Sequence, residues 1–306
     1  MISTFQGIMD AARDGGARKR IAVPAVKRGD LNLLSRAVKG GLAVPVIVGD
    51  GRAMEALVKK SPLASLEHEI LDVGESGGAL PEAIRLVREG RADILMQGGL
   101  DQKAFLGAVL DAKTGLRKGR LASYASVLQL MKRDKLILVT DTFVNNFPGA
   151  AEKQLIIENA IGLAGLLGMG SLKIAALAAI EQVNPSISST LDAAVLSKMS
   201  ERKQFGDAVV EGPLDMDCAL SQVAASRKGL KSEVTGNVDI YLVPDIETGY
   251  PLVQALVFFG RMKTAGVLLG TVKPVILNLP FISGENRLVE IALASLMCGK
   301  GGGNNG

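Results

Sequence analysis

Residues 236–249, which read GNVDIYLVPDIETG, decide the fold of this chain. Ile240, Leu242 and Val243 belong to an apolar run that is too short for a membrane span and rich in residues that favour a β-strand. The run ends abruptly in a polar turn at residues 244–249. Because the carboxyl ends of strands in an open α/β sheet bind ligands, we expect a ligand site at this turn.

Strand and helix patterns alternate on both sides of this stretch. In the first part we expect strands at 20–26, 44–48, 69–73, 93–96 and 135–140, and helices at 30–39, 81–89 and 102–110. After a fresh start we expect helices at 152–167, 189–200, 218–227, 252–262 and 286–297, and strands at 172–176, 208–210, 240–243, 265–269 and 274–277. This alternation predicts mostly parallel sheets covered by helices on both faces.

The chain is long enough for two domains of ordinary size or for one large α/β unit, and the alternation of strands and helices begins afresh after about residue 140. Residues 1–140 form the first domain, which a C-terminal helix at about 285–298 joins, and residues 141–284 form the second. The Gly- and Asn-rich residues 299–306 are expected to be a flexible tail.

Composition excludes several classes of function. The 306 residues are 48% hydrophobic and include no tryptophan, so the core is expected to be aliphatic. Lysine and arginine number 35 against 31 acidic residues, and the basic residues are scattered rather than interleaved with aromatic ones. We therefore expect a mixed, solvated surface and no nucleic-acid partner.

The chain has few residues suited to metal or redox chemistry. Cys218 and Cys298 are too few and too far apart for a disulfide framework or a zinc site, and His68 has no partner motif and is expected to be a surface strand residue. No apolar run has the length of a signal peptide core or a membrane span. We expect a cytoplasmic protein without a metal centre and without membrane contact.

Four further blocks resemble one protein family: KIAALAAIEQVNP at 173–185, TLDAAVLSKMSE at 190–201, VEGPLDMDCALS at 210–221 and KTAGVLLGTVKP at 263–274. Together with the opening stretch, they resemble the phosphate butyryltransferase branch of the phosphate acetyl/butyryl transferase family. The resemblance implies two α/β/α domains, similar to those of the isocitrate and isopropylmalate dehydrogenases, with an active site in the cleft between them and usually a homodimer.

The resemblance also implies an activity. Members of the family exchange a short acyl group between coenzyme A and inorganic phosphate, so acyl-CoA and phosphate are the expected substrates and no bound cofactor is expected. Such chemistry needs cationic or hydroxyl donors for phosphate and for the developing oxyanion. It also uses a carboxylate that accepts or returns the thiol proton.

The chain departs from the family where this chemistry is placed. After a Lys-Pro pair the family carries Ser-Arg followed shortly by Asp, whereas Leu279, Pro280 and Ile282 occupy those positions here. Arg287, further along in the final helix, is expected on a solvated face. The catalytic residues are therefore left unassigned.

A second group of departures lies in the first half. Residues 96–110 read MQGGLDQKAFLGAVL where the family has MKGLVNTSDFLRAVL, so Gln97 replaces a lysine and Gly107 an arginine. Tyr124 stands where histidine is frequent, and Tyr250 replaces an asparagine. Losing guanidinium donors weakens phosphate binding, because neither proline nor glycine can replace their planar fork.

Eight polar residues remain candidates for substrate binding: Arg117, Arg120, Asp141, Asn145, Asp245, Glu247, Lys263 and Lys273. The four cations either bind phosphate groups or lie on a solvated surface. Asp141 and Asn145 follow a strand end, where both a ligand role and a helix-capping role are open. Asp245 and Glu247 either cap a helix or shape a pocket beside the acyl chain.

The leading hypothesis is a phosphate acyltransferase of the acetyl/butyryl type. One alternative is a catalytically degenerate relative that binds acyl-CoA or an acidic metabolite as a sensor or partner. Another is an acyltransferase with a changed acceptor, since the lost arginines specifically disfavour phosphate.

Overall fold

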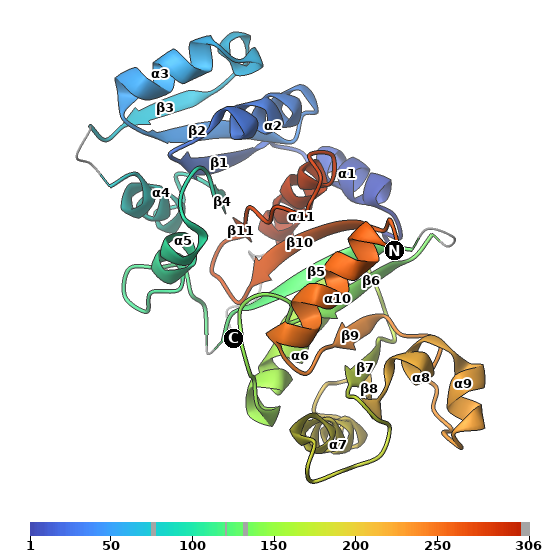
Figure 1. Cartoon of the computed structure of the whole chain (residues 1–306). Coiled ribbons are helices and arrows are strands. Elements are labelled where there is room, and N and C mark those ends of the chain that lie inside the picture. The colour runs from blue at the N-terminus through green and yellow to red at the C-terminus, as the bar shows by residue number, and fades with distance from the viewer. Residues whose placement is uncertain (75–77, 120, 131–133, 301–306) are drawn as a thin grey trace. The chain divides into compact units, whose positions relative to one another are not determined.

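The computed structural model describes residues 1–74, 78–119, 121–130 and 134–300, and the chain divides into two compact units (Figure 1). Unit 1 comprises Met1–Thr4 and Ser123–Thr264, and unit 2 comprises Phe5–Ala122 and Ala265–Gly306. These bounds differ from those expected from sequence, which place the divisions near residues 140 and 284. The strands Ser123–Gln129 and Leu136–Thr140 group with the later part of the chain instead.

Unit 2 contains a largely parallel sheet. Its strand order is β3 (Glu69–Asp72), β2 (Ala43–Gly49), β1 (Lys19–Pro24), β4 (Ile94–Met96), β11 (Val275–Ile276) and β10 (Lys263–Leu269). Every pair is parallel except β10 with β11. The helices are α1 (Phe5–Asp14), α2 (Arg28–Lys39), α3 (Gly51–Lys59), α4 (Ala79–Arg88), α5 (Gln102–Val109) and α11 (Asn286–Lys300), with a short 3₁₀ turn, η1 (Pro62–Ser65).

Unit 1 repeats this arrangement around a second set of strands. Their order is β5 (Ser123–Gln129), β6 (Leu136–Thr140), β9 (Ile240–Leu242), β7 (Lys173–Leu177) and β8 (Val209–Leu214). Only β5 and β6 pair in antiparallel fashion. The helices are α6 (Ala150–Leu166), α7 (Ser188–Glu201), α8 (Met216–Leu220), α9 (Gln222–Arg227) and α10 (Ile246–Phe258).

Burial along the strands confirms that helices and loops cover both faces of the parallel strands. Ile21, Ala22 and Val23 are consecutive in β1 and each is fully buried, as are Ile174 and Ala175 in β7. Successive strand residues point to opposite faces, so consecutive burial requires cover on both sides. The opening stretch, around β9, lies at the centre of unit 1, between β6 and β7.

Several elements differ from the sequence-based expectation. The helix expected at 218–227 is two helices, because the backbone of Ser221 is extended and its side chain caps α9 by accepting from the amide of Ala224. Helix α10 begins earlier than expected, at Ile246, and carries Pro251 in its interior. His68 precedes β3 and does not lie in it. Helices α1 and α3 and strand β5 are not among the elements expected from the sequence.

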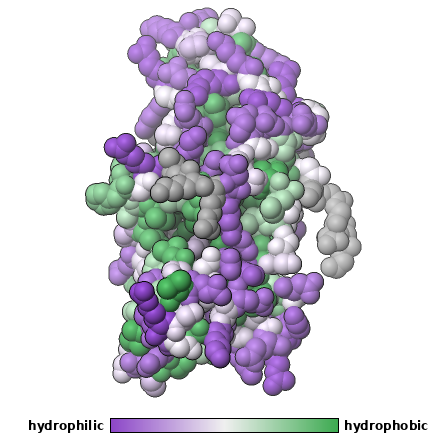
Figure 2. Space-filling view, turned by 90° about the vertical axis from the view of Figure 1, so that its right-hand side faces the viewer, coloured by the Kyte–Doolittle hydropathy of each residue, from purple (hydrophilic) through white to green (hydrophobic). Residues whose placement is uncertain are grey.

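The surface is chemically mixed, as the composition indicates. Hydrophilic and hydrophobic residues are interspersed over the face shown in Figure 2. Exposed apolar side chains include Leu220, Val223, Phe258 and Phe259. In the described part of the chain, no helix combines the length and apolar character that crossing a bilayer requires.

Candidate functional site

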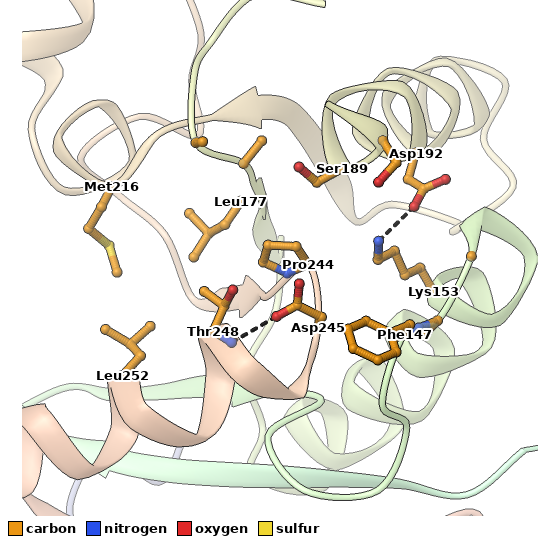
Figure 3. Close-up of a pocket in the computed structure, with 15 residues that line it drawn as sticks. Phe147, Lys153, Leu177, Ser189, Asp192, Met216, Pro244, Asp245, Thr248 and Leu252 are labelled. Atoms are coloured by element: carbon orange, nitrogen blue, oxygen red, sulfur yellow. Dashed lines mark hydrogen bonds and ion pairs between the residues drawn. The ribbon is translucent and has the colours of Figure 1, made fainter. Parts of the chain in front are cut away.

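A pocket of about 660 Å³ lies in unit 1, lined by residues that directly follow the carboxyl ends of β7 and β9 (Figure 3). This is where ligands bind in open α/β sheets. Its apolar lining residues are Phe147, Pro148, Leu177, Ala178, Ala179, Met216, Pro244 and Leu252. Gly149, Lys153, Ser188, Ser189, Asp192, Asp245 and Thr248 complete the lining. A concave, largely apolar surface with a few polar groups is typical of small-molecule sites.

A buried ion pair contributes to the polar part of the pocket. Lys153 of α6 has a side chain that is only 5% exposed, and its Nζ lies 2.7 Å from a carboxylate oxygen of Asp192 on α7. Lys153 lies on the buried face of α6 with Ile156, Ile157 and Ala160. The carboxylate partner offsets part of the cost of taking the Lys153 charge out of water.

Of the helices that begin at the pocket, α10 and α7 differ in how their first turns are capped. The carboxylate of Asp245 accepts a hydrogen bond of 2.7 Å from the amide of Thr248 and so caps α10. Helix α7 starts without a side-chain cap, and Ser188 and Ser189 of its first turn line the pocket. Asp245 therefore caps a helix and lines a pocket, and its expected place beside the acyl chain stays a prediction.

Asp141 and Asn145 organise the loop that follows β6. Asp141 is 2% exposed, and its Oδ1 accepts from the amides of Tyr124, Phe143 and Val144 at 3.0, 2.9 and 3.1 Å. Its Oδ2 accepts from the amide and the side-chain Nδ2 of Asn145. Burial raises the pKa of the Asp141 carboxyl, and the surrounding N–H donors oppose that shift. The ligand role of both residues stays a prediction.

The remaining candidates are more dispersed. Glu247 and Lys263 are exposed, and Lys273 is half-buried. Arg117 is exposed and its backbone pairs with Thr271 in an isolated antiparallel bridge of unit 2. Arg120 lies outside the described residues.

In unit 2, Leu279 and Ile282 are core residues. They are 2% and 7% exposed, whereas Pro280 between them is exposed. Arg287 is not on a solvated face as expected, because its side chain is only 11% exposed. Its Nη1 donates a hydrogen bond to Asn278 Oδ1, and its Nε lies 3.8 Å from the carboxylate of the fully buried Glu290.

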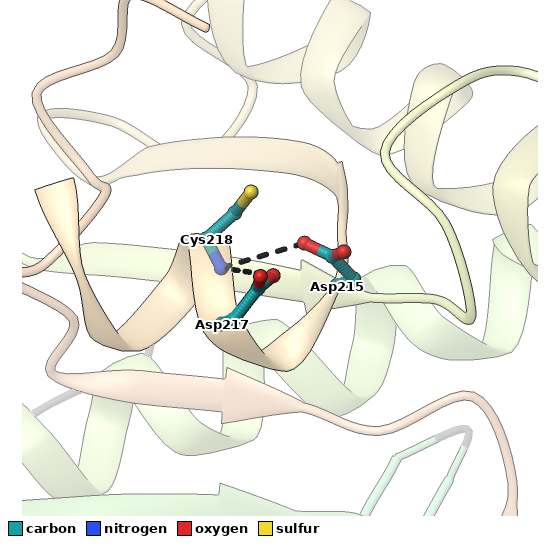
Figure 4. Close-up of side chains that lie close together, drawn as sticks. All are labelled: Asp215, Asp217 and Cys218. Carbon is teal, nitrogen blue, oxygen red and sulfur yellow. Dashed lines mark hydrogen bonds between the residues drawn. The ribbon is translucent and has the colours of Figure 1, made fainter. Parts of the chain in front are cut away.

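A third polar cluster lies at the start of α8 (Figure 4). Asp215, Asp217 and Cys218 bring three possible metal-ligand atoms within 4.8 Å of one another. Lys228 supplies a positive charge to this cluster, because its Nζ lies 3.0 Å from Asp217 and also forms ion pairs with Asp215 and Glu181. Burial and the neighbouring Asp215 raise the pKa of Cys218 to about 12, which disfavours the thiolate that binds metals. We read the cluster as a salt bridge network.

The charge of Asp215 is expected to stabilise the fold in a pH-dependent way. Partial burial raises its pKa, but hydrogen bonds from Cys218 and Lys228 outweigh that and lower it to about 2. The stabilisation is therefore complete above the unfolded-state pKa near 3.8 and is lost as the pH falls through about 2. Asp215→Asn removes the charge but keeps a side chain that can cap α8. We expect it to lower the free energy of unfolding by about 1–2 kcal/mol at pH 7. Urea unfolding of the variant and of the unmodified protein at pH 7 and at pH 2.5 measures this loss of stability. An equal loss at both pH values would contradict the prediction.

Comparison with known proteins places this chain in a family. Residues 78–286 match the family model described as phosphate acetyl/butaryl transferase. The chain is 36% identical over 299 residues to the phosphate butyryltransferase of Clostridium acetobutylicum, covering 98% of this chain and 99% of that protein. The chain belongs to this family.

Other relatives of the phosphate acetyl/butaryl transferase family agree in sequence and in fold. The phosphate acetyltransferase of Rhizobium meliloti is 34% identical over 294 residues, 96% of this chain and 93% of that protein. The crystal structure of a branched-chain phosphotransacylase from Enterococcus faecalis superposes with a TM-score of 0.78 at 27% identity, covering 91% and 99% of the two chains.

The two stretches that depart from the family pattern, residues 96–110 and 277–287, contact each other in unit 2. Gln97, where the family has lysine, is 3% exposed, and its Oε1 accepts a 2.9 Å hydrogen bond from the amide of Asn278. The side chain of Asn278 in turn accepts from Arg287. Gln97, Asn278 and Arg287 are thus connected by hydrogen bonds.

Sequence reasoning missed the ion pair of the pocket. A signal for Lys153 was nevertheless present, since it lies three and four residues before Ile156 and Ile157, on the apolar face of its helix. A lysine in such a position is expected to be buried and paired. Asp192 gave no such signal, because its pairing depends on how α6 and α7 pack.

Proposed function

We propose that this protein is a phosphate acyltransferase that transfers a short acyl group between coenzyme A and inorganic phosphate. The observation that carries the proposal is the near full-length identity with the phosphate butyryltransferase of Clostridium acetobutylicum. The fold supports it, because unit 1 holds a ligand-sized pocket at the strand ends. Coenzyme A and its acyl thioester are substrates here, and no bound cofactor takes part.

In this proposal phosphate attacks the thioester carbonyl, and the thiolate of coenzyme A leaves with a proton. Unit 2 supplies the cations for phosphate. Arg117 pairs through its backbone with Thr271, two residues before Lys273, so both positively charged residues belong to the same part of the unit. Their positive charge would attract phosphate.

The proposal includes a homodimer in the cytoplasm. Large exposed apolar side chains support self-association, with Phe258 and Phe259 at the end of α10 being 64% and 90% exposed. Both proposed substrates, acyl-CoA and phosphate, are abundant in the cytoplasm, which supports that location.

A specific observation favours a second function, namely acyl-CoA binding without transfer to phosphate. Leu279 and Ile282 are buried in the core of unit 2 and Pro280 has no donor, so none of the three can act on phosphate or on a thiol. These are the positions at which the resemblance places the family's Ser, Arg and Asp. A protein of this kind would retain the pocket of unit 1 as its binding site.

An assay of coenzyme A release separates the two functions. With butyryl-CoA as substrate, we expect release that requires phosphate and proceeds at an enzyme-like rate of roughly 1 s⁻¹ or faster. The measurement follows the free thiol spectroscopically, with and without phosphate, for acetyl-, butyryl- and longer acyl-CoA. Binding of butyryl-CoA without phosphate-dependent release would reject transfer and support the second function.

A further inference from the structure

The pocket of unit 1 has two chemically distinct ends. In Figure 3, Met216, Leu177 and Leu252 gather at one side, while Lys153, Asp192 and Ser189 gather at the other. Pro244 and Thr248 lie between them. A ligand that fills this pocket therefore needs an apolar end and a polar end that can form hydrogen bonds.

The charge balance of the pocket argues against an anionic ligand. Lys153 is the only cation among its lining residues, and its Nζ is already bound to the carboxylate of Asp192. Asp245 adds a second carboxylate to the lining, so the pocket carries a net negative charge. Among these lining residues, phosphate and the nucleotide phosphates of coenzyme A would find no guanidinium fork.

We propose that this pocket binds the acyl-pantetheine end of acyl-CoA and that Met216, with Leu177 and Leu252, sets the length of the acyl chain. The proposal rests on the proposed function for the identity of the substrate. The acyl chain lies at the apolar end, where each buried methylene is favourable. The amide groups of pantetheine, which are neutral, lie toward Ser189 and Thr248, whose hydroxyls both donate and accept hydrogen bonds.

Met216 offers the cleanest test because its side chain is half-buried, so replacing it disturbs the core little. Met216→Trp fills the apolar end of the pocket, and Met216→Ala enlarges it. Met199→Trp on α7 is the matched control, since Met199 is also half-buried in unit 1 but does not line the pocket. The chain has no tryptophan of its own, so each Trp variant also carries a single fluorescent probe of folding.

The measurement is calorimetric binding of acetyl-, butyryl- and hexanoyl-CoA without phosphate, so that no transfer to phosphate takes place. We expect Met216→Trp to weaken the binding of hexanoyl-CoA about tenfold or more, while the affinity for acetyl-CoA changes little. Met216→Ala should raise the affinity for hexanoyl-CoA relative to butyryl-CoA, and Met199→Trp should match the unmodified protein. Folding of every variant is checked by circular dichroism.

The outcomes distinguish this inference from the proposed function. If phosphate-dependent transfer occurs but folded Met216 variants keep the original chain-length profile, the pocket assignment is overturned and the activity stands. If the profile shifts as expected but phosphate releases no coenzyme A, the pocket assignment stands and transfer is rejected. Failure of the unmodified protein to bind any acyl-CoA would overturn both.

Discussion

Replacing Arg287 by methionine is expected to lower the free energy of unfolding by about 3–5 kcal/mol. Arg287 is 11% exposed and lies beside Glu290, which is fully buried and accepts a 3.1 Å hydrogen bond from the amide of Gly266. It also lies near Asp30, a carboxyl with 5% exposure whose raised pKa the guanidinium charge partly lowers. Methionine would leave the buried Glu290 carboxylate without this cation, and Asp30 with the positive charge of Lys27 but not that of Arg287. Urea unfolding followed by far-ultraviolet circular dichroism measures the change.

Two further variants test whether charge, rather than packing, causes the loss. Arg28→Met removes an exposed arginine in the same unit and should change the free energy of unfolding by less than about 0.5 kcal/mol. Glu290→Gln keeps an acceptor for the Gly266 amide but removes the buried negative charge. Combined with Arg287→Met, it should recover part of the lost stability. A double variant no more stable than Arg287→Met would show that the ion pair is not the cause.

Most of the fold followed from local sequence patterns. The apolar runs of β1, β2 and β7 are bounded by turn residues, and both their existence and their parallel pairing were predicted correctly. The elements that were missed carry weaker signals. Strand β5 reads SYASVLQ, with small and polar residues that fit no clear strand alternation, although six of its seven residues are buried in the structure. Tertiary burial, rather than local preference, makes it a strand.

The candidate site could be predicted only in part. Asp245 could be placed at a strand end because the polar turn that follows β9 is visible in the sequence. The partners of Lys153 and Arg287 could not be predicted, because Asp192 and Asn278 belong to other segments. Only the packed structure brings those segments near the two cations. The sequence showed the lost family residues at 279–282, but it did not show that Arg287 would be drawn into a buried network beside them.

Asp141→Ala is expected to cost about 3–5 kcal/mol of unfolding free energy. The Asp141 carboxylate accepts from four backbone amides, among them the buried amide of Tyr124, and from the side chain of Asn145. Alanine leaves all of these donors without that acceptor, and each unmet buried donor costs about 1–3 kcal/mol. The three tyrosines, Tyr124, Tyr241 and Tyr250, all lie in unit 1, so tyrosine fluorescence during urea unfolding reports on the affected unit.

Asp111→Ala is the matched control for this prediction. Asp111 Oδ1 also accepts three hydrogen bonds, from the amides of Lys113 and Thr114 and from the Thr114 hydroxyl, but Asp111 is exposed. Water replaces the lost acceptor there, so the expected cost is below about 1 kcal/mol. Asp141→Asn keeps one carbonyl oxygen, so its loss of unfolding free energy should lie between those of Asp141→Ala and Asp111→Ala. Equal costs for Asp141→Ala and Asp111→Ala would mean that burial of the donors does not set the energy, and that the loop after β6 owes its conformation to other contacts.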